Sequence, residues 1–511
     1  MKFFFLLLGL LPSLVAAQSA GIGFVGSRPQ DIQLLSRSYV KFGAINLEWK
    51  DIEPKEGEYD WTALDTQLEK YYQLGKAVPI RINTPVPDWV FNYVACVGTS
   101  RGGNAPQYWD PRYLSILDKM ISSYAHHLGN SPYKKAVMSV RMQYNALNTE
   151  IFSFEASYLH GTATADRTKW KLPADGHVYS PDLTPQLEGE LMQKITEMYM
   201  THFYKYEIPV TLRLPSEAQL TKRGFNGTEI FDRWCQNPLT RLMTTHYSLS
   251  LIGSEEANIF RRRCRQFGTF AFMEQFGSIA PLEKGKGAMS SEDLQKMRTI
   301  NYFGGKGVIS KELSKEQSVY WSMLMLLDWG GSYLSLYSRD LEWVDQYPEL
   351  PAVFEFVNRY AGYHSAPEKS PGAWRVFGEF FGKTAKTPSE KNWGWYLTEE
   401  SLANTSPVNF QGGSADVVGV YARRFNGPVK FILDPKFVDS LSGQVYISLV
   451  QLASSADPFS VEGASLIDST PYAGKWVKTR FSLPAEAIAT GFTVNPNGTP
   501  VLHLLEVTRA P

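Results

Sequence analysis

Glu274 stands near the end of a short apolar run that is bounded by glycines, residues 268–278 (GTFAFMEQFGS). Such a run is typical of a strand buried on both faces, as in a parallel sheet covered by helices. A carboxylate at the carboxyl end of a buried parallel strand lies where barrel enzymes keep their reactive groups. A second carboxylate at the end of another strand would complete a pair able to do acid–base and nucleophilic chemistry.

Glu150 is our candidate for the second carboxylate. It comes seven residues after an expected strand over 136–143, at the end of the segment YNALNTE. Glu155 lies about one turn further on and stays an alternative. For each glutamate, a structural carboxylate at a strand end is the competing interpretation.

Alternating strand and helix patterns surround these glutamates. The expected strands are 21–25, 44–49, 78–83, 136–143, 208–214, 247–252, 268–278 and 332–337. Helical spacing of apolar residues is found between them, for example over 61–74, 230–243, 255–266, 315–327 and 351–360. Asp110 and Thr184, each followed by a proline, are expected helix caps.

Eight strands that alternate with helices predict an α/β fold, a (β/α)8 TIM barrel over residues 18–364. The alternative, a doubly wound open sheet, would usually show a glycine-rich nucleotide loop after an early strand, and no glycine group here has that spacing.

The composition and hydrophobic pattern of the sequence change after Gly362. Residues 365–372 (SAPEKSPG) have the composition of a linker. Short β-rich runs follow at 417–421, 429–433, 445–450, 476–481 and 501–507. Such runs, with no helical stretch between them, predict an antiparallel β-sandwich domain over 373–511.

The first 17 residues predict a cleaved secretory signal, with Lys2 followed by an apolar stretch and a small-residue end. The apolar stretch is shorter than the ~20 residues of a membrane span, so a membrane anchor is the less favoured interpretation. We therefore expect an extracellular, secreted protein that does not stay at a membrane. The sequons at Asn226, Asn404 and Asn497 predict N-glycosylation and agree with export.

Charge and cysteine content exclude several classes of protein. Lys+Arg and Asp+Glu both number 51, so no net charge favours nucleic acid. The one basic run, 261–265, is interpreted as a solvated helix face. Three cysteines allow at most one internal disulfide and suit neither a disulfide scaffold nor a zinc site. We expect no cofactor and no metal.

Residues 47–61 (LEWKDIEPKEGEYDW) resemble the retaining glycoside hydrolases of the large barrel clan that contains the β-galactosidases. Members open the second barrel unit with a Trp, then Glu-Pro, a Gly and a Tyr-Asp-Trp turn. Here those positions are Trp49, Glu53-Pro54, Gly57 and residues 59–61. The resemblance continues through a strand and a Pro-x-Trp that ends at Trp89, and it is strongest over 44–89.

The resemblance implies a secreted β-glycosidase that cleaves a polysaccharide or glycan by a retaining mechanism. In that clan the acid/base glutamate follows strand four and the nucleophile ends strand seven, which implies Glu150 and Glu274 respectively. Many members carry adjacent Asn-Glu after strand four, whereas Thr149 separates Asn148 from Glu150 here. This departure keeps open a second hypothesis, a non-catalytic carbohydrate-binding protein on the same scaffold.

Polar and aromatic residues near the strands are candidates for substrate binding. Arg81, Asn83 and Arg213 lie near strand ends and could orient the glutamates or bind sugar hydroxyls. Both arginines could equally point outward to the helix layer. The aromatic residues Trp89, Trp329 and Tyr333 fit a platform for stacking sugars, with core packing as the alternative for each.

Overall fold

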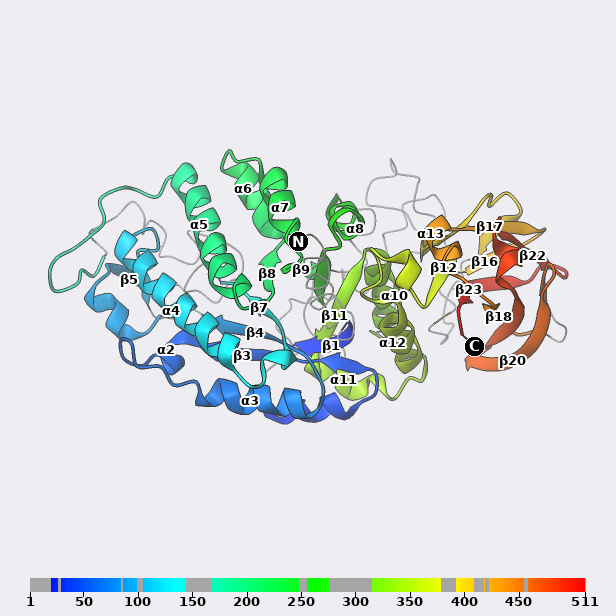
Figure 1. The fold of residues 1–511 in the computed structure, drawn as a ribbon, viewed down its shortest axis with the longest axis horizontal. Helices are drawn as coiled ribbons and strands as arrows, with labels where there is room; N and C mark the ends of the chain where they lie inside the picture. The colour runs from blue at the N-terminus through cyan, green and yellow to red at the C-terminus, as the bar shows by residue number, and fades with distance from the viewer. Residues whose placement is uncertain are drawn as a thin grey trace, which may run out of the picture. The chain divides into compact units, whose positions relative to one another are not determined.

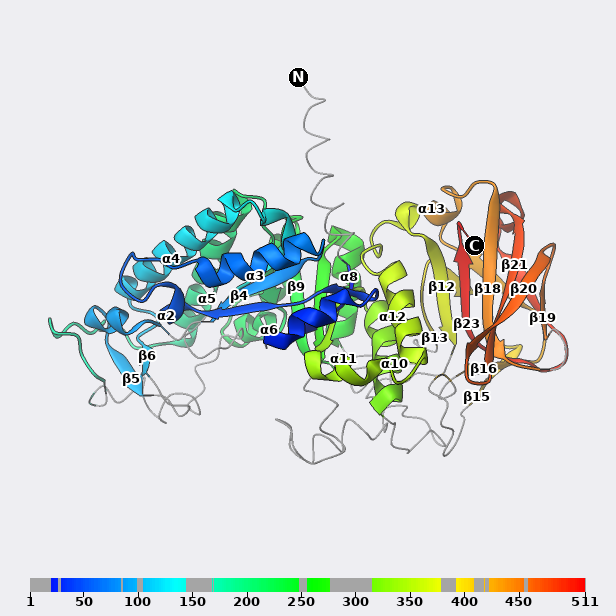
Figure 2. The same ribbon diagram turned by 90° about the horizontal axis from the view of Figure 1, so that it is seen from below.

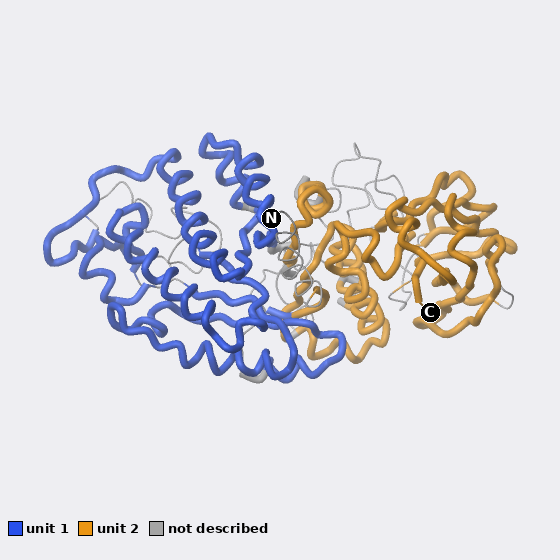
Figure 3. Tube along the Cα trace, viewed as in Figure 1, with its two compact units in different colours: residues 1–19, 24–244 blue, residues 20–23, 245–511 orange. Residues whose placement is uncertain are grey.

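In the computed structural model the chain forms two compact units, shown in Figure 3. Unit 1 comprises Met1–Ser19 and Phe24–Thr244, and unit 2 comprises Ala20–Gly23 and Thr245–Pro511. The structure describes residues 20–25, 29–83, 86–98, 104–143, 168, 170–247, 255–275, 315–377, 392–408, 418, 422–454 and 458–510. The division at residue 244 falls inside the expected barrel domain, so the boundaries at 364 and 372 stay predictions.

The strands of unit 1 follow one another in chain order. β3 (Ile45–Glu48), β4 (Val78–Asn83), β7 (Val137–Arg141), β8 (Val210–Arg213) and β9 (Thr240–Tyr247) each pair in parallel with the next. Unit 1 also contains the short strand β2 (Val40–Phe42) and the antiparallel pair β5 (Cys96–Gly98) and β6 (Asn104–Pro106). Parallel neighbours in chain order are what the β/α prediction requires.

The helices of unit 1 run beside these strands in Figures 1 and 2. They are η1 (Pro29–Ser36), α2 (Trp49–Ile52), α3 (Thr62–Gln73), η2 (Asp88–Asn92), α4 (Pro111–Asn130), η3 (Lys134–Ala136), α5 (Pro185–Tyr204), α6 (Pro215–Lys222) and α7 (Gly227–Cys235). Both expected caps are confirmed, because the Asp110 side chain accepts from Arg112 N at 2.8 Å and Thr184 Oγ1 accepts from Leu187 N at 3.2 Å. Among the helices described in either unit, none combines the length and apolarity needed to cross a membrane.

The sixth expected strand is placed wrongly by the sequence pattern. We expected a helix over 230–243 and a strand over 247–252, but α7 ends at Cys235 and β9 begins at Thr240. Pro238 lies between them. A proline lacks the N–H that a helix needs and turns the preceding residue away from helical geometry, so it ends the helix early.

Unit 2 begins with β/α elements of the same kind. β10 (Phe270–Gln275) pairs in parallel with β11 (Gly331–Tyr337), and the other neighbour of β11 is β1 (Gly21–Val25). The helices are α8 (Glu255–Phe267), α10 (Lys315–Asp328), α11 (Ser338–Val344) and α12 (Glu349–Tyr360). The parallel β/α architecture expected of this part of the chain is therefore present in both units.

The basic run 261–265 is not a solvated helix face. It lies on α8, where Arg263 is fully buried and Arg261 forms an ion pair of 3.1 Å with the buried Asp328. Burial raises the pKa of Asp328, and Arg261 opposes that shift. Arg261 therefore compensates the charge of Asp328, because a buried carboxylate needs a charged partner.

The second half of unit 2 is antiparallel, as predicted. One sheet has eight strands, with the order β13-β12-β23-β18-β21-β20 and with β15 and β16 attached; the other has four, in the order β14-β17-β22-β19. The bounds are β12 (Gly372–Phe377), β13 (Asn392–Trp395), β14 (Leu397–Glu399), β15 (Thr405–Val408), β16 (Ala422–Phe425), β17 (Val429–Leu433), β18 (Gln444–Leu452), β19 (Phe459–Val461), β20 (Ser465–Ala473), β21 (Trp476–Pro484), β22 (Phe492–Pro496) and β23 (Val501–Thr508). One hydrophobic core joins the two sheets, with Phe431 and Val494 from the smaller and Ile447 and Leu505 from the larger.

Candidate functional site

Of the two predicted catalytic glutamates, Glu274 lies in the described part of the structure and Glu150 does not. Glu274 is the next-to-last residue of β10, where it pairs with Ser335 of β11. Its backbone therefore lies at the carboxyl end of the strand, as expected. Glu150 and Glu155 lie outside the described residues, so the assignment of a catalytic pair stays a prediction.

The register between β3 and β4 gathers polar residues on one face. Asn46 pairs with Arg81, and Glu48 pairs with Asn83. Laterally paired residues of a sheet share a face, as do residues two apart along a strand. These four side chains therefore lie on the same face, which we call the polar face of unit 1.

The polar face continues across β7 and β8. Pro79, two residues before Arg81, pairs with Ser139, and Arg141 pairs with Thr211. Thr211 Oγ1 donates a hydrogen bond of 2.8 Å to Ser139 Oγ, which confirms that these side chains share a face. Arg213, two residues after Thr211, follows on the same face.

The opposite face of the same strands meets the helices. Thr240 of β9 pairs with Val210, which lies on the face opposite Arg213. The Thr240 hydroxyl lies 2.8 Å from Tyr204 OH of α5 and donates to Trp234 O of α7 at 2.6 Å. The helix layer therefore covers the other face, and the two predicted arginines point away from the helices rather than into them.

Several amide groups on the polar face have unused hydrogen-bonding capacity. Gln143, two residues beyond Arg141, is fully buried, and neither its Oε1 nor its Nε2 has a partner among the described residues. The same holds for Asn83 Oδ1 and Asn46 Oδ1. An unsatisfied buried polar group costs about 1–3 kcal/mol, so such a group calls for an explanation. Sugar hydroxyls both donate and accept, and they would satisfy amides of this kind.

Sequence reasoning identified Arg81, Asn83 and Arg213 on this face but missed Asn46 and Gln143. The sequence contained part of the information needed to find Gln143, because it is the last residue of the expected strand 136–143. Two-residue alternation from Arg141 would have marked it as polar on a strand whose other face is apolar. Asn46 needs the register with Arg81, which local sequence does not determine.

The residues that carry the family resemblance form a local hydrogen-bond network around Glu53. Buried Glu53 accepts from Trp49 Nε1 at 2.7 Å and from Gly57 N at 2.9 Å, and its carbonyl accepts from Trp89 Nε1 at 2.9 Å. Gly57 has a φ of +74°, a left-handed conformation that favours glycine. Glu53 is therefore a structural carboxylate, and it fixes the edge of the Trp89 indole. Because Trp89 is only partly buried, it remains a candidate for stacking on a sugar.

The structure corrects the expectation that Trp329 and Tyr333 belong to a platform for stacking sugars. Trp329 is fully buried and comes before β11, at the end of the strand opposite to the one where barrel enzymes bind substrate. Tyr333 is 1% exposed in the middle of β11 and stacks on Phe270 with 5.8 Å between ring centroids. Both aromatic rings pack inside unit 2, and neither presents a face to a sugar.

The asparagines of the three sequons are exposed. Asn226 caps α7, accepting from Glu229 N at 3.2 Å and donating to Glu229 Oε2 at 3.0 Å. Asn404 Nδ2 donates to Pro428 O at 2.7 Å. Accessibility is what glycosylation requires, and modification at Asn226, Asn404 and Asn497 stays a prediction.

The donor set for metals is sparse in the part of the chain that is described. No group of three or more His, Cys, Asp and Glu side chains there is arranged to hold a metal ion. Cys96, Cys235 and Cys264 are all buried and free.

Comparison with known proteins points to one class. Residues 26–101 match the family model Glyco_hydro_42, described as β-galactosidase. The resemblance read from residues 44–89 is therefore confirmed, and the match covers the hydrogen-bond network around Glu53. No curated protein matches the sequence.

Particular solved structures similar to the chain include glycoside hydrolases. A β-galactosidase from the psychrophilic Marinomonas ef1 has 11% identity and a TM-score of 0.38, covering 70% of this chain and 62% of its own. A β-galactosidase from Rahnella sp. R3 has 12% identity and a TM-score of 0.39, covering 67% and 57%. A xylanase from Paenibacillus barcinonensis has 11% identity and a TM-score of 0.34, covering 64% and 86%. The chain thus spans less than two thirds of the length of both β-galactosidases.

Proposed function

We propose that the protein is a secreted glycoside hydrolase that cleaves the O-glycosidic bonds of a polysaccharide or glycan. The observation that carries the proposal is the match of residues 26–101 to the β-galactosidase family model. The polar face of unit 1 supports it, because Asn83 Oδ1 and the buried amide of Gln143 have no hydrogen-bond partner among the described residues and suit a polyhydroxylated ligand. Export rests on the signal predicted over residues 1–17, and the C-terminal sheets with their shared core favour a β-sandwich.

The proposed mechanism is a retaining double displacement. Glu274, ionised, attacks the anomeric carbon, while Glu150, protonated, gives its proton to the departing glycosidic oxygen. The bond from carbon to the leaving oxygen breaks as the bond to Glu274 forms. Glu150 then takes a proton from water, and that water displaces Glu274 with overall retention.

Two carboxylates ~5–5.5 Å apart are needed for this chemistry. The charge on the nucleophile raises the pKa of its neighbour, which keeps the acid protonated at the working pH. Arg81, Asn83, Arg213 and Gln143 would bind hydroxyl groups of the substrate, and Trp89 would stack on a sugar face.

The decisive test is hydrolysis of a panel of aryl β-glycosides and polysaccharides by wild type and Glu274→Ala. We expect activity in the wild type, loss in the variant, and partial recovery with azide, which replaces the missing nucleophile. Glu150→Ala and Glu155→Ala form the matched pair for the acid, and only the former should lose activity on substrates with poor leaving groups. Equal activity of wild type and Glu274→Ala would refute the assignment.

A non-catalytic carbohydrate-binding protein is the second candidate function. The inserted Thr149 between Asn148 and Glu150 favours it, because that residue departs from the adjacent Asn-Glu of the clan. Binding of a glycan in calorimetry, without hydrolysis of any member of the panel, would support this function over the first.

A further inference from the structure

The eight-stranded sheet of unit 2 has one apolar and one charged face. Ile447 and Leu449 of β18, together with Phe481 of β21, point into the shared hydrophobic core. Ser448 lies between the first two and pairs with both Arg480 and Glu506. Because neighbours along a strand alternate, Ser448, Arg480 and Glu506 lie together on the face away from that core.

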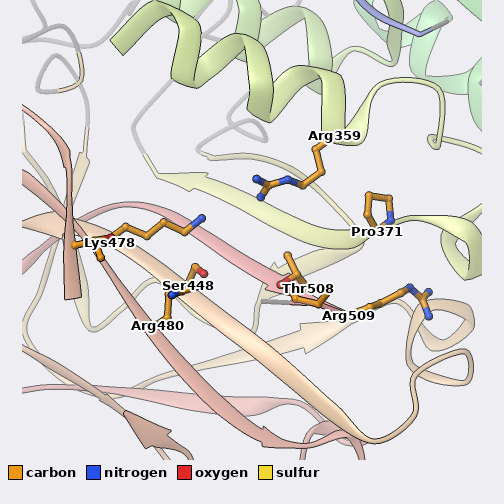
Figure 4. A pocket seen from close by; sticks show the side chains of 9 residues that line it. Arg359, Pro371, Ser448, Lys478, Arg480, Thr508 and Arg509 are labelled. Carbon is orange, nitrogen blue, oxygen red and sulfur yellow. Dashed lines mark hydrogen bonds between the residues drawn. The ribbon is translucent and has the colours of Figure 1, made fainter. Parts of the chain in front are cut away.

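A cavity of about 600 Å³ lies over this charged face. Its lining residues are Arg359, Pro371, Ser448, Thr470, Lys478, Arg480, Thr508, Arg509 and Ala510. Four of them are cations and none is a carboxylate. In Figure 4, the ends of Arg359, from α12, and Lys478, from β21, point toward one another across the cavity. This volume is within the usual range for small-ligand pockets, about 300–1,000 Å³.

Glu506 is the buried counter-charge beneath two of these cations. Its side chain is 2% exposed and accepts from Arg359 NH1 at 2.7 Å, Lys478 Nζ at 2.9 Å and Tyr360 OH at 2.9 Å. Burial alone would raise the pKa of Glu506, but Lys478 and Arg359 outweigh it, and the pKa is lowered. Glu506 is therefore ionised at neutral pH, and its one negative charge faces two positive ones.

The other two cations differ, because Arg480 forms an ion pair with a carboxylate whereas Arg509 is attracted by one without forming an ion pair. Arg480 forms a two-pronged ion pair with Asp468, with Nε at 2.8 Å from Oδ1. Arg509 donates to Ser370 O at 2.8 Å and to Ser440 O at 2.6 Å, and none of the ion pairs found among the described residues includes it, although the charge of Glu368 attracts it. Four cations around the cavity thus face three carboxylates, those of Glu506, Asp468 and Glu368, which leaves one positive charge.

We propose that this cavity is a binding site for the anionic group of an acidic glycan, a carboxylate or sulfate on a sugar ring. Ammonium and guanidinium groups form the strongest hydrogen bonds to such oxyanions. Ser448, Thr470 and Thr508 add hydroxyl groups to the same lining, which suit the hydroxyls of a saccharide. The choice of a glycan as carrier of the anion rests on the proposed function, whereas the anion site rests on the charges of the cavity.

Nucleic acid is a less suitable occupant than a glycan. The cavity lining contains no aromatic residue on which a base could stack. The chain has no net charge, so no overall positive field favours a phosphate backbone. RNA binding is accordingly one of the outcomes of the test.

The test uses the full chain with Glu274→Ala, which prevents cleavage during titration calorimetry. The probes are an oligogalacturonate, a neutral galacto-oligosaccharide of the same length, sodium sulfate and a single-stranded RNA. We expect the oligogalacturonate to bind more tightly than the other three, with an affinity that falls as salt is added. Equal binding of the neutral oligosaccharide or of RNA would overturn the proposal, as would sulfate binding as tightly as the glycan.

Thr470 offers a variant that spares the buried ion pairs. It is exposed on β20, lines the cavity and pairs with Lys478. Thr470→Glu adds a negative charge beside the cations and should weaken oligogalacturonate binding about tenfold, which is 1.4 kcal/mol. Thr470→Gln, of the same size without charge, and Ser460→Glu, an exposed position on β19, should stay within about twofold.

Unchanged affinity in Thr470→Glu, with an unfolding temperature equal to that of its parent, would overturn the site. Because the readout is binding in a chain that already lacks Glu274, failure of the anion site and failure of the hydrolase proposal give different results. An inactive wild type that binds oligogalacturonate in the Thr470-dependent way would refute only the hydrolase.

Discussion

Thr211 Oγ1 donates a hydrogen bond of 2.8 Å to Ser139 Oγ, joining neighbouring strands β8 and β7 on the polar face of unit 1. Both side chains are buried, at 2% and 1% exposure. The bond joins β8, which carries Arg213, to β7, which leads to Gln143, so it helps to hold the spacing of these two groups proposed to bind substrate.

Thr211→Val should lower the free energy of unfolding by about 1–3 kcal/mol, because it leaves the Ser139 hydroxyl buried without its donor. Adding Ser139→Ala should recover part of the loss, since both polar partners are then gone. Urea unfolding of the wild type, two single variants and the double variant measures the coupling. Additive losses would show that the two hydroxyls do not interact.

Gln143→Leu should separate stability from function. Its amide is fully buried and has no partner in the described part of the chain, so an apolar side chain of similar size should leave the free energy of unfolding unchanged or raise it by about 1 kcal/mol. The same variant should lower kcat/KM at least tenfold if the amide binds a sugar hydroxyl. Urea unfolding and steady-state kinetics give the two values. Loss of stability with unchanged kinetics would mark Gln143 as structural.

Glu53→Ala should destabilise unit 1 by about 2–4 kcal/mol, because the buried carboxylate accepts hydrogen bonds from Trp49 Nε1 and Gly57 N. Glu58→Ala is the matched control, since Glu58 lies in the same turn, is exposed and forms an ion pair with exposed Lys55. That control should cost less than about 0.5 kcal/mol. Tryptophan fluorescence during urea unfolding follows both. Equal effects of the two substitutions would contradict a structural role for Glu53.

His364 should make stability depend on pH in the mildly acidic range. Burial lowers the pKa of His364 to about 3, and its Nε2 lies 2.9 Å from Leu327 O. The unfolded chain has the ordinary pKa of about 6.5, so it binds a proton first. His364 therefore contributes stability above pH 6.5 that is lost as the pH falls toward 3.

The matched variant is His364→Gln, which keeps a donor near Leu327 O but does not titrate. Between pH 6 and 4, the wild type should lose up to about 1.4 kcal/mol per pH unit relative to this variant. Subtracting the two unfolding curves removes the contributions of all other groups. A constant difference across that range would show that the pKa of His364 is the same in the folded and unfolded chain.

Local signals in the sequence were sufficient to predict where α4 and α5 start and where β4 lies, although they placed the sixth strand wrongly. Asp110-Pro111 and Thr184-Pro185 predicted the first turns of α4 and α5, because the side chain that caps a helix and the proline that follows are contiguous. The strand 78–83 was predicted with the bounds that β4 has. Such features depend on residues a few positions apart, which the chain brings together in any conformation.

Only the tertiary structure decided which way side chains point and which distant residues meet. Arg81 and Arg213 could have faced the helices, and the strand register placed them on the polar face. Trp329 is a residue type that commonly stacks on sugars, yet it is buried just before the amino end of β11. The cavity between Arg359 and Lys478 joins positions 119 residues apart. Register and burial arise from contacts between separate elements, and a one-residue change in register would turn every side chain of a strand to its other face.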